Sequence, residues 1–407
     1  MPKAPGWAAS LSAPSPPSSA RASRSRRPRP STAPSSTSRW RCSSPNRWIT
    51  DTLRRRALRA ASAQAKGACR MAYATPESPT SLPHPKTPDG KTRLLGVEVE
   101  FGGLTEARAA QILAEAAGSA AQRKGGDYRV DGTPFGSCKL YMDTTYRDQD
   151  DTALGRAALD LARAVVPVEL VTEPFSPGRL DRLDEVLTRF RKAGATGTND
   201  GLFLGFGVHL NVQIRDDSPR HLWSVLTAFA LTEPLLRDAY GIDLSRRALP
   251  FVDPYPAKLS DALTRGQPDT VEALAQSYFD ISPSRNHALD MLPIFAHLLP
   301  ETTRRALARG AGGTVSARPA YHYRMPDCRI DNPAWSLSGE WAIWCQIEAL
   351  AEDHATLDRL CTAWREMRAD PLERLRGHIN GWQEESGALL EEAGHGGLTA
   401  AARALAT

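Results

Sequence analysis

The stretch Leu94–Gly103, LLGVEVEFGG, reads as a strand with two chemically different faces. Successive side chains of a strand point to opposite faces. One face is then an apolar row, made by Leu95, Val97, Val99 and Phe101. The other row carries Glu98 and Glu100, two carboxylates one pleat apart, whose like charges repel unless water or a cation lies between them. Because hard cations such as Mg²⁺ prefer oxygen ligands, the strand predicts either a solvated sheet face or a metal-binding one.

Four later segments alternate in the same way: residues 139–146, 165–175, 205–214 and 320–331. Their polar rows carry side chains of the types that bind metals and phosphates: Asp143, Glu169, His209, Asn211, His322 and Arg324. A face that only meets solvent usually carries mixtures of Ser, Thr and Lys instead. Strands that point acids, imidazoles and a guanidinium the same way would line a cation-binding funnel, so the set as a whole favours a functional face.

Segments with helical periodicity lie between these strands. They cover residues 105–117, 151–165, 180–193, a helix that begins at Ser218 and is kinked by Pro234, residues 334–368, and a polar helix beyond residue 371 that is followed by a Gly/Ala-rich tail. Most of the strands alternate instead of reading as continuous Val/Ile runs. The sequence therefore predicts an α+β fold, with a largely antiparallel sheet and helices on one side of it.

The charge of the 407-residue chain is divided unevenly. Residues 1–70 contain 15 Lys or Arg residues and one acid, whereas the remainder contains 36 basic and 45 acidic residues. The net charge of +5 therefore belongs to the beginning of the chain. Because the rest is acidic, we do not expect the folded domain to bind nucleic acid.

Residues 1–90 are rich in Ser, Pro, Arg and Ala and lack apolar periodicity, which predicts a disordered basic tail. Three interpretations compete for it: an organelle transit peptide, a basic arm that contacts nucleic acid or anionic membrane, or an over-extended translation whose true start is Met71. The stray Trp and Cys residues favour the last. We expect a catalytic domain over residues 91–370 and a helical C-terminal extension over residues 371–407.

Cysteine spacing and hydropathy bear on the compartment. The six cysteines are scattered without a CxxC pair, which argues against a zinc ribbon or a disulfide framework and suits a reducing cytoplasm. The apolar runs are too short and too polar to cross a bilayer, and no secretory signal is evident. We therefore expect a cytoplasmic protein without a membrane partner.

Seven segments, taken in order, resemble the amidoligase family of the carboxylate–amine ligase superfamily, which includes glutamine synthetase and glutamate–cysteine ligase. They are GVEVEFGGL, LYMDTTY, PVELVTEPF, GFGVHLNVQI, SRRALPFVDPYP, SPSRNHALDMLPIFAHL and YHYRMPDCRIDNPAWSLSGEW. Together they span roughly residues 93–368. The series GxExEF, ELVTxP and GxHxN is fairly specific, whereas any one of its elements alone would be weak.

The resemblance implies a glutamine-synthetase-like catalytic fold, in which the concave polar face of a curved antiparallel sheet binds ATP and Mg²⁺. It also implies a reaction: ATP phosphorylates a carboxylate, and an amine displaces phosphate from the acyl phosphate to form an amide. The substrates would be small-molecule or peptide carboxylates and amines. A homo-oligomer is compatible with the resemblance, since such enzymes often assemble.

On the metal side, the resemblance makes Glu98 and Glu100 ligands of Mg²⁺ and Glu169 a carboxylate of the next metal-facing strand. It places His209 near the metal and the nucleotide phosphates, with Asn211 beside it. One residue departs from glutamine synthetase: His322 stands where that enzyme has the glutamate of its E-x-R element. Imidazole is a poorer Mg²⁺ ligand than carboxylate, so fewer metal ions, a preference for Mn²⁺ or a substitute acid would follow.

On the anion side, the resemblance places Arg324 near the transferred phosphate, with Arg329 assisting. Three further arginines are candidates for binding a substrate carboxylate or a phosphate, since a planar guanidinium binds both bidentately; they are Arg246, Arg247 and Arg285. Asp143 is a weaker candidate for the metal or amine site.

Two other functions compete with an ATP-dependent ligase. A two-metal hydrolase could use the same acids and His209 without any nucleotide. Alternatively, a binding or scaffold protein could have kept the fold, lost catalysis and used the basic tail for its interactions. Walker, HExxH, GxSxG and GxGxxG motifs are absent, which excludes P-loop, zincin, serine hydrolase and Rossmann interpretations.

Overall fold

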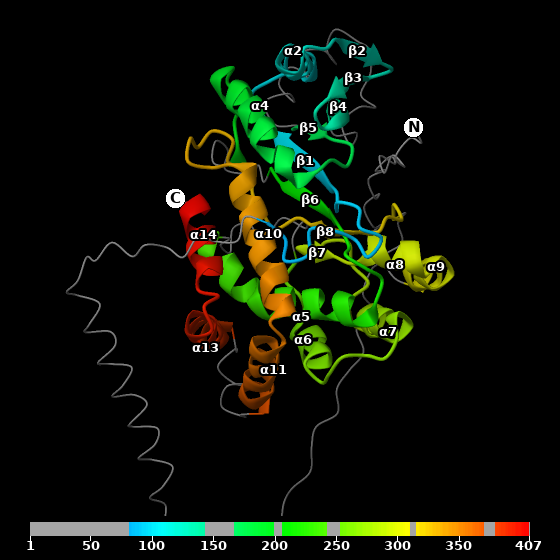
Figure 1. Cartoon of the computed structure of the whole chain (residues 1–407), viewed down its shortest axis with the longest axis vertical. Helices are drawn as coiled ribbons and strands as arrows, with labels where there is room; N and C mark the ends of the chain where they lie inside the picture. Colours follow the sequence, from blue (N-terminus) through cyan, green and yellow to red (C-terminus); the bar gives the residue numbers. More distant parts are fainter. Residues whose placement is uncertain are drawn as a thin grey trace, which may run out of the picture. The chain divides into compact units, whose positions relative to one another are not determined.

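The computed structural model describes residues 81–142, 167–198, 206–241, 253–309, 315–369 and 379–406 (Figure 1). The predicted tail before residue 81 and the predicted helix over residues 151–165 lie outside the described residues. So do three candidate site residues, Asp143, Arg246 and Arg247.

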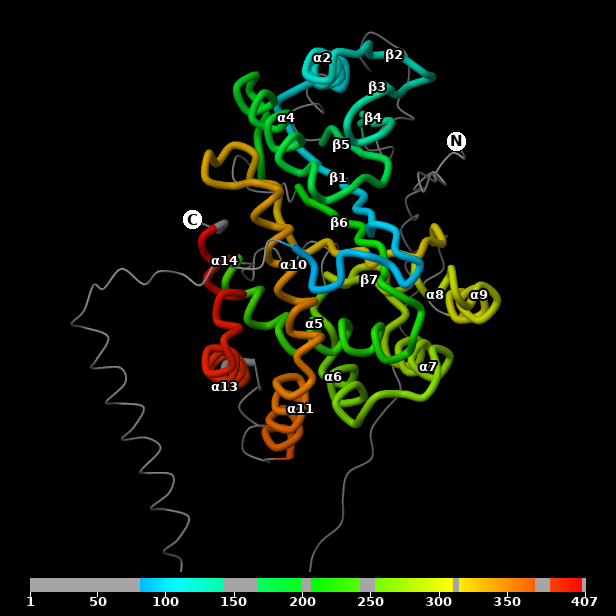
Figure 2. The backbone as a smooth tube through the Cα atoms, in the orientation of Figure 1, coloured from blue at the N-terminus to red at the C-terminus, as the bar shows by residue number. Residues whose placement is uncertain are grey.

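The described strands form one antiparallel sheet of eight strands in the order β2-β3-β4-β5-β1-β6-β8-β7. They are β1 Leu95–Phe101, β2 Ala121–Lys124, β3 Asp127–Thr133, β4 Gly136–Met142, β5 Val168–Val171, β6 Val208–Gln213, β7 Leu289–Asp290 and β8 Ala320–Tyr323. The strand β1, which contains the two glutamates, pairs with β5 on one side and β6 on the other. Figure 2 shows β1 and β6 side by side although they are far apart in the chain.

The described helices are α2 Glu106–Ala117, α4 Leu180–Lys192, α5 Pro219–Ala239, α6 Ala257–Leu263, α7 Val271–Ile281, α8 Leu292–Leu298, α9 Pro300–Arg309, α10 Leu337–Glu352, α11 His354–Ala369, α13 Ile379–Glu392 and α14 Gly397–Ala406, with a 3₁₀ turn η2 at Pro177–Arg179. Side-chain caps mark the residues at which two of these helices begin. The hydroxyl of Thr105 accepts a hydrogen bond from the amide of Arg108 at the start of α2, and the hydroxyl of Ser218 accepts one from the amide of His221 at the start of α5. The mixed helix and antiparallel sheet fold is that of the predicted α+β class.

Helices cover the apolar face of the sheet. Phe101 of β1 packs on Phe190 of α4 with ring centroids 5.1 Å apart. Tyr321 and Tyr323 of β8 each lie 5.3 Å from Trp344 of α10, measured between centroids. The row predicted to be apolar in β1 is wholly buried. Since the core takes this face, the polar row of every paired strand is turned to the opposite side.

Two predicted boundaries were wrong. The single helix expected over residues 334–368 is two helices, because the carboxylate of Asp353 caps the second one: Oδ1 accepts the amide of Thr356 at 3.1 Å and Oδ2 accepts its hydroxyl at 2.6 Å. The Gly/Ala-rich end expected as a tail instead forms α14, which contacts α5 and α10. In this region Trp335, Trp341 and Trp344 are buried in the core.

Glycine is required where β1 ends. Gly103 has a φ of 77°, and a Cβ there would lie 2.2 Å from the carbonyl oxygen of Gly194. The neighbouring Gly102 exchanges both backbone hydrogen bonds with Thr196 at 3.0 Å. The FGG sequence therefore lets the end of β1 approach the segment after α4 closely, at a position where a side chain would be both strained and obstructed.

A buried ion pair joins the segment just before β1 to α10 and to the end of β6. The guanidinium of Arg93 donates two hydrogen bonds of 2.7 Å to the carboxylate of Glu348 and two more, of 2.8 and 2.6 Å, to the carbonyl of Gln213. Trp344 Nε1 also donates to this carboxylate at 2.8 Å. Such geometry satisfies both charges, but removal of one partner would leave the other buried and uncompensated.

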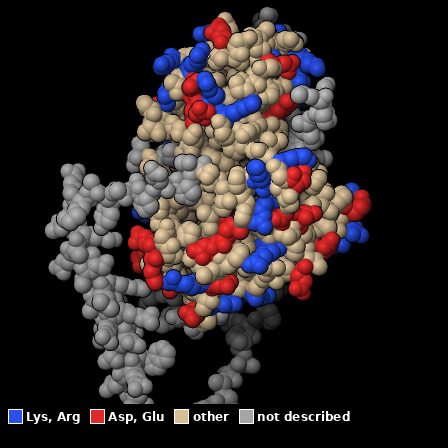
Figure 3. Space-filling model, viewed as in Figure 1, with Lys and Arg blue, Asp and Glu red and all other residues tan. Residues whose placement is uncertain are grey.

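The described helices and the surface bear on two kinds of partner, membranes and nucleic acids. Among the described residues, no helix is both long and apolar enough to span a membrane. On the face shown in Figure 3, Lys and Arg side chains are interspersed with Asp and Glu. That face therefore offers no extended basic patch of the kind that nucleic acid binding uses.

We expect Glu348→Ala to lower the free energy of unfolding by about 3–5 kcal/mol, because it leaves the buried charge of the Arg93 guanidinium without its partner. Urea unfolding followed by circular dichroism measures this loss. Glu301→Ala, which breaks the exposed pair with Arg304, is the matched control and should leave the unfolding midpoint unchanged. A loss below about 1 kcal/mol for Glu348→Ala would show that the pair is not a main support of the fold.

The pH dependence of stability should report on Glu340. This buried carboxyl accepts hydrogen bonds from the Tyr240 hydroxyl and from Trp335 Nε1, and burial raises its pKa to about 7. The folded protein then keeps this proton up to about pH 7 whereas the unfolded chain releases it near pH 4.5. Stability therefore falls as pH rises through this window, by about 3 kcal/mol.

A glutamine side chain cannot ionise. We therefore expect the unfolding free energy of Glu340→Gln to lack the decline with rising pH that the wild type shows. Urea unfolding of both proteins at several pH values between 4.5 and 8 provides the comparison, since groups common to both cancel. Parallel pH profiles for the two proteins would contradict the assignment.

Candidate metal centre and anion site

The sheet register brings the predicted polar rows together. Direct neighbours across paired strands are Glu98 with His209, Glu100 with Glu169, and Asn211 with His322. The sequence predicted that these strands point acids and imidazoles the same way. The structure places them on one face, opposite the face that the helices cover.

This polar face is mostly buried. Glu98, Glu169, His209, Asn211 and His322 are each 9 % exposed or less, and Glu100 is half-buried. A face that only meets solvent would leave such side chains exposed. Burying a charge costs free energy unless it is paired or binds a ligand, so the solvated interpretation does not hold for these five residues.

Glu98 lies at the centre of a hydrogen-bonded network. Its Oε2 is 2.8 Å from Nδ1 of His209, and its Oε1 accepts a hydrogen bond of 2.8 Å from Nδ2 of Asn211. Burial by itself would raise the pKa of Glu98. The hydrogen bond from His209 and the nearby positive charge, including that of Arg318, instead hold this pKa well below its usual range. Glu98 is therefore an ionised carboxylate with both oxygens engaged.

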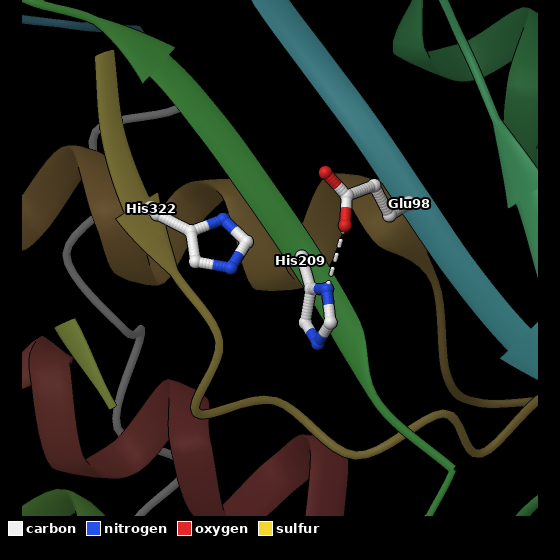
Figure 4. Close-up of side chains that lie close together, drawn as sticks. All are labelled: Glu98, His209 and His322. Atoms are coloured by element: carbon white, nitrogen blue, oxygen red, sulfur yellow. Dashed lines mark hydrogen bonds and ion pairs between the residues drawn. The ribbon is translucent and has the colours of Figure 1, made fainter. Parts of the chain in front are cut away.

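Two imidazoles lie beside this carboxylate (Figure 4). The rings of His209 and His322 meet edge to face, with centroids 5.0 Å apart. One potential ligand atom from each of Glu98, His209 and His322 lies within 4.8 Å of the others. Burial, followed by the charge of Arg318, lowers the pKa of His322 well below its usual value. His322 is therefore a neutral imidazole, which is the form that binds a metal.

A glycine keeps space open next to the imidazole of His209. A Cβ placed on Gly207 would lie 3.1 Å from His209 Nε2 and 3.5 Å from Glu100 Oε2. The amide of Gly207 donates to the same Glu100 oxygen at 2.8 Å. An imidazole nitrogen and a carboxylate oxygen thus border one small space that any other residue would fill. This donor set and this space fit a divalent cation.

A second cluster, the arginine cluster, consists of Arg285, Arg318 and Arg324 around Asp290. Asp290 is fully buried; its Oδ1 accepts the amide of Leu292 at 2.8 Å and its Oδ2 lies 4.0 Å from Nε of Arg285. Burial raises the pKa of Asp290 to about 6 against the influence of all three arginines. Arg324 donates from Nη1 to the carbonyl of Arg285 at 3.0 Å. The cluster carries more positive than negative charge.

Buried atoms of this cluster that have no hydrogen-bond partner among the described residues include Arg318 Nε, Arg324 Nε and Asp290 Oδ2. Each such atom costs about 1–3 kcal/mol when it is left without a partner. Native proteins rarely keep several of these atoms together without a reason. Excess positive charge with unused donors is the arrangement expected of an anion-binding site.

Asn211 connects the two clusters. Its amide nitrogen donates to Glu98, and its Oδ1 accepts a hydrogen bond of 2.6 Å from Nη2 of Arg318. The acid–imidazole group and the arginine cluster are therefore parts of one continuous site.

Sequence reasoning missed two members of the site, Arg318 and Asp290. Arg318 precedes β8 and reaches Asn211 only because β8 pairs with β6. Asp290 lies in β7, which has two residues and therefore no detectable alternation. The only available signal was its place within the segment SPSRNHALDMLPIFAHL. Of the other candidates, Arg285 and Arg324 lie in the arginine cluster, whereas Arg329 donates to the carbonyl of Tyr240 at 3.0 Å, near Asp327.

Gly207→Ala tests the space beside His209. The φ of Gly207 lies outside the left-handed region, so we expect alanine to leave the melting temperature nearly unchanged. The added methyl group should weaken Mn²⁺ binding, measured by calorimetric titration, by about tenfold to a hundredfold. Gly178→Ala is the matched control, because a Cβ there meets only Ser176 Oγ, at 3.9 Å. Equal Mn²⁺ affinity in wild type and Gly207→Ala would show that no metal binds in this space.

Comparison with known proteins agrees with the geometry. The profile of a protein family described as "Putative amidoligase enzyme" matches residues 91–346, a range that contains every residue of both clusters. No curated protein matches the chain. Since the matched range covers more than half of the sequence, the chain belongs to this amidoligase family.

Proposed function

We propose that this protein is an ATP- and divalent-cation-dependent ligase that joins a carboxylate to an amine through an acyl phosphate. The observation that carries the proposal is the continuity of two sites of opposite character. The acid–imidazole group suits a cation, the arginine cluster suits a phosphate or carboxylate, and Asn211 contacts both. Membership of the amidoligase family supports a ligase of some kind.

The chemistry of phosphoryl transfer explains why these residue types would be needed. Such transfer needs little covalent help from a protein; it needs fixed positions and charge stabilisation on the transferred group. A divalent cation, when bound, would neutralise charge on phosphate oxygens. Arg324 and Arg318 would hold the phosphoryl oxygens from the other side with guanidinium donors that are already in place.

The same proposal extends to the fold and the cation. An antiparallel sheet with one helix-covered face and one polar face supports a glutamine-synthetase-like catalytic domain over residues 91–370. Glu98, Glu100, Glu169 and the two histidines are the candidates to hold Mg²⁺ or Mn²⁺. The substrates we propose are a small-molecule or peptide carboxylate and an amine.

The competing functions explain less of this site. A metal-dependent hydrolase would use the acids and His209 but has no need of three arginines beside them. A silent scaffold would gain nothing from buried donors without partners, which destabilise the fold. The arginine cluster therefore favours a substrate that carries a phosphoryl group.

Nucleotide binding tests the proposal directly. We expect a non-hydrolysable ATP analogue to bind saturably in calorimetric titrations only when Mg²⁺ or Mn²⁺ is present. Arg324→Gln removes charge-assisted donors and should weaken this binding by about tenfold to a hundredfold. Arg305→Gln, at an exposed position of α9, is the matched control and should bind like the wild type. Absence of binding with either cation would overturn the ligase.

Hydroxylamine can then replace the unknown amine. Incubation with ATP, a divalent cation, hydroxylamine and a panel of carboxylic acids should yield ADP and a hydroxamate in equal amounts for the correct acid. The acid that gives this product identifies the substrate. Hydrolysis of an amide, supplied in place of the carboxylic acids and without any nucleotide, would favour the hydrolase instead.

A further inference from the structure

A serine and a histidine form a hydrogen-bonded pair at the end of α7, outside the acid–imidazole group and the arginine cluster. Ser282 is the residue at which this helix ends, and its amide donates to the carbonyl of Tyr278 at 2.9 Å. His287 lies further along the chain and is 3 % exposed. Oγ of Ser282 and Nε2 of His287 are 2.6 Å apart. A hydroxyl that contacts an imidazole in this way has the geometry in which enzymes activate a serine.

A backbone carbonyl decides which nitrogen of His287 carries the proton. Nδ1 lies 3.2 Å from the carbonyl oxygen of Asp253, and this oxygen only accepts, so Nδ1 is the donor. Burial lowers the pKa of His287, so the ring is neutral at neutral pH and Nε2 keeps a lone pair. The hydroxyl of Ser282 therefore donates to Nε2, and the lone pairs of its oxygen face away from the ring, where they are available for attack on an electrophile.

The surroundings of His287 suit a general base. The rings of Tyr255 and Tyr278 pack on the imidazole, with centroids 4.7 and 6.4 Å from its own, and fix its orientation. A proton taken from Ser282 would create an imidazolium at the C-terminus of α7, where the partial negative charge of the helix end stabilises it. Ser282 is half-buried, so the core does not enclose it. The pair thus combines an oriented base with a serine that is partly open to solvent.

We propose that Ser282 and His287 are a catalytic dyad that takes an acyl group from an activated donor, either an ester or an acyl phosphate. Oγ of Ser282 attacks the carbonyl carbon of the donor, and its proton passes to Nε2 of His287. The bond from that carbon to the leaving oxygen then breaks, and the leaving alcohol or phosphate takes the proton from Nε2. The acyl group is now an ester of Ser282.

An amine or water then releases the acyl group. Its nitrogen or oxygen bonds to the carbonyl carbon of the ester, and one of its protons passes through Nε2 of His287 to Oγ of Ser282 as the bond from the carbon to Oγ breaks. The products are an amide or an acid, and the serine is restored. These two steps use only the donor and the acceptor, so the activity goes beyond the proposed ligase and does not need its nucleotide.

The place of the dyad indicates which donors suit it. Ser282 precedes Arg285 of the arginine cluster by three positions, a length of chain that spans at most about 11 Å. The carbonyl of Arg285 in turn accepts a hydrogen bond from Arg324. The dyad therefore lies near a group of guanidinium charges, which favours donors that carry a phosphate or a carboxylate.

Sequence motifs could not reveal this pair. The GxSxG motif belongs to a turn between a strand and a helix, whereas Ser282 follows a helix. Its absence therefore excludes serine enzymes of that type only. Serine–histidine pairs recur on unrelated folds and are recognised by their geometry.

A fluorophosphonate probe, which transfers its phosphonyl group to activated serines with loss of fluoride, tests the dyad on the full chain without any nucleotide. We expect mass spectrometry to find this adduct on Ser282, and an acetyl group on the same residue after p-nitrophenyl acetate. His287→Asn keeps a donor for the Asp253 carbonyl but has no Nε2, so labelling should slow by about a hundredfold or more. Ser284→Ala is the matched control, because the hydroxyl of Ser284 accepts the amide of Asn286 at 3.1 Å, and it should be labelled like the wild type.

Ser282→Cys provides a second readout. A thiol beside an imidazole base loses its proton more easily and reacts faster with iodoacetamide than an ordinary thiol. At neutral pH we expect the thiol of Ser282→Cys to react about tenfold faster or more than the thiol of Ser284→Cys, each followed on its own peptide by mass spectrometry. The difference should vanish when His287→Asn is added to both variants.

Circular dichroism melts of each variant establish that it is folded. An adduct on Ser282 whose formation is slowed in a folded His287→Asn protein supports the dyad. Absence of an adduct on Ser282 in the wild type, equal labelling rates in a folded His287→Asn protein, or equal reactivity of the two thiols would overturn it and leave a structural hydrogen bond. If His287→Asn does not fold, the comparison of the two thiols decides alone. None of these assays contains a nucleotide, so their outcome is independent of the ligase.

Discussion

The carboxylate of Glu98 is the group on which the polar face depends. It is an ionised group with 5 % exposure, and such a charge is tolerated only when its hydrogen bonds are complete. The two donors come from alternate positions of β6, His209 and Asn211, which lie on the same side of the strand. A shift of one residue in the β1–β6 register would replace both with apolar side chains. The buried charge therefore specifies the register as strongly as the core does.

Packing on the apolar face offsets the free-energy cost of the buried polar groups on the other face. Aromatic packing of α4 and α10 on the sheet, together with the Arg93–Glu348 pair, stabilises the sheet from its apolar side. The polar side can then hold groups that oppose folding. Arg318 Nε, Arg324 Nε and Asp290 Oδ2 are buried without hydrogen-bond partners among the described residues. Residues that lower stability and persist together are characteristic of binding sites rather than of structural networks.

Strand alternation was sufficient to predict which face of β1 enters the core and that the polar rows of the other strands share one side. Helical periodicity predicted a helix over residues 180–193, and α4 covers Leu180–Lys192 with five buried apolar residues. It could not separate α10 from α11, since the cap at Asp353 lies within a helical pattern. Arg318 and Asp290 escaped prediction for another reason: their roles depend on pairing between distant segments, and β7 is too short to show a period.

The different surroundings of Glu98 and Glu100 show where a motif stops being informative. In the sequence the two residues are equivalent, both on the polar row and one pleat apart. In the sheet Glu98 faces His209, a donor, whereas Glu100 faces Glu169, another acid. A donor opposite a carboxylate stabilises its charge, whereas a second carboxylate opposite it repels that charge. The cross-strand partner, and not the residue type, therefore sets the electrostatic surroundings of each glutamate.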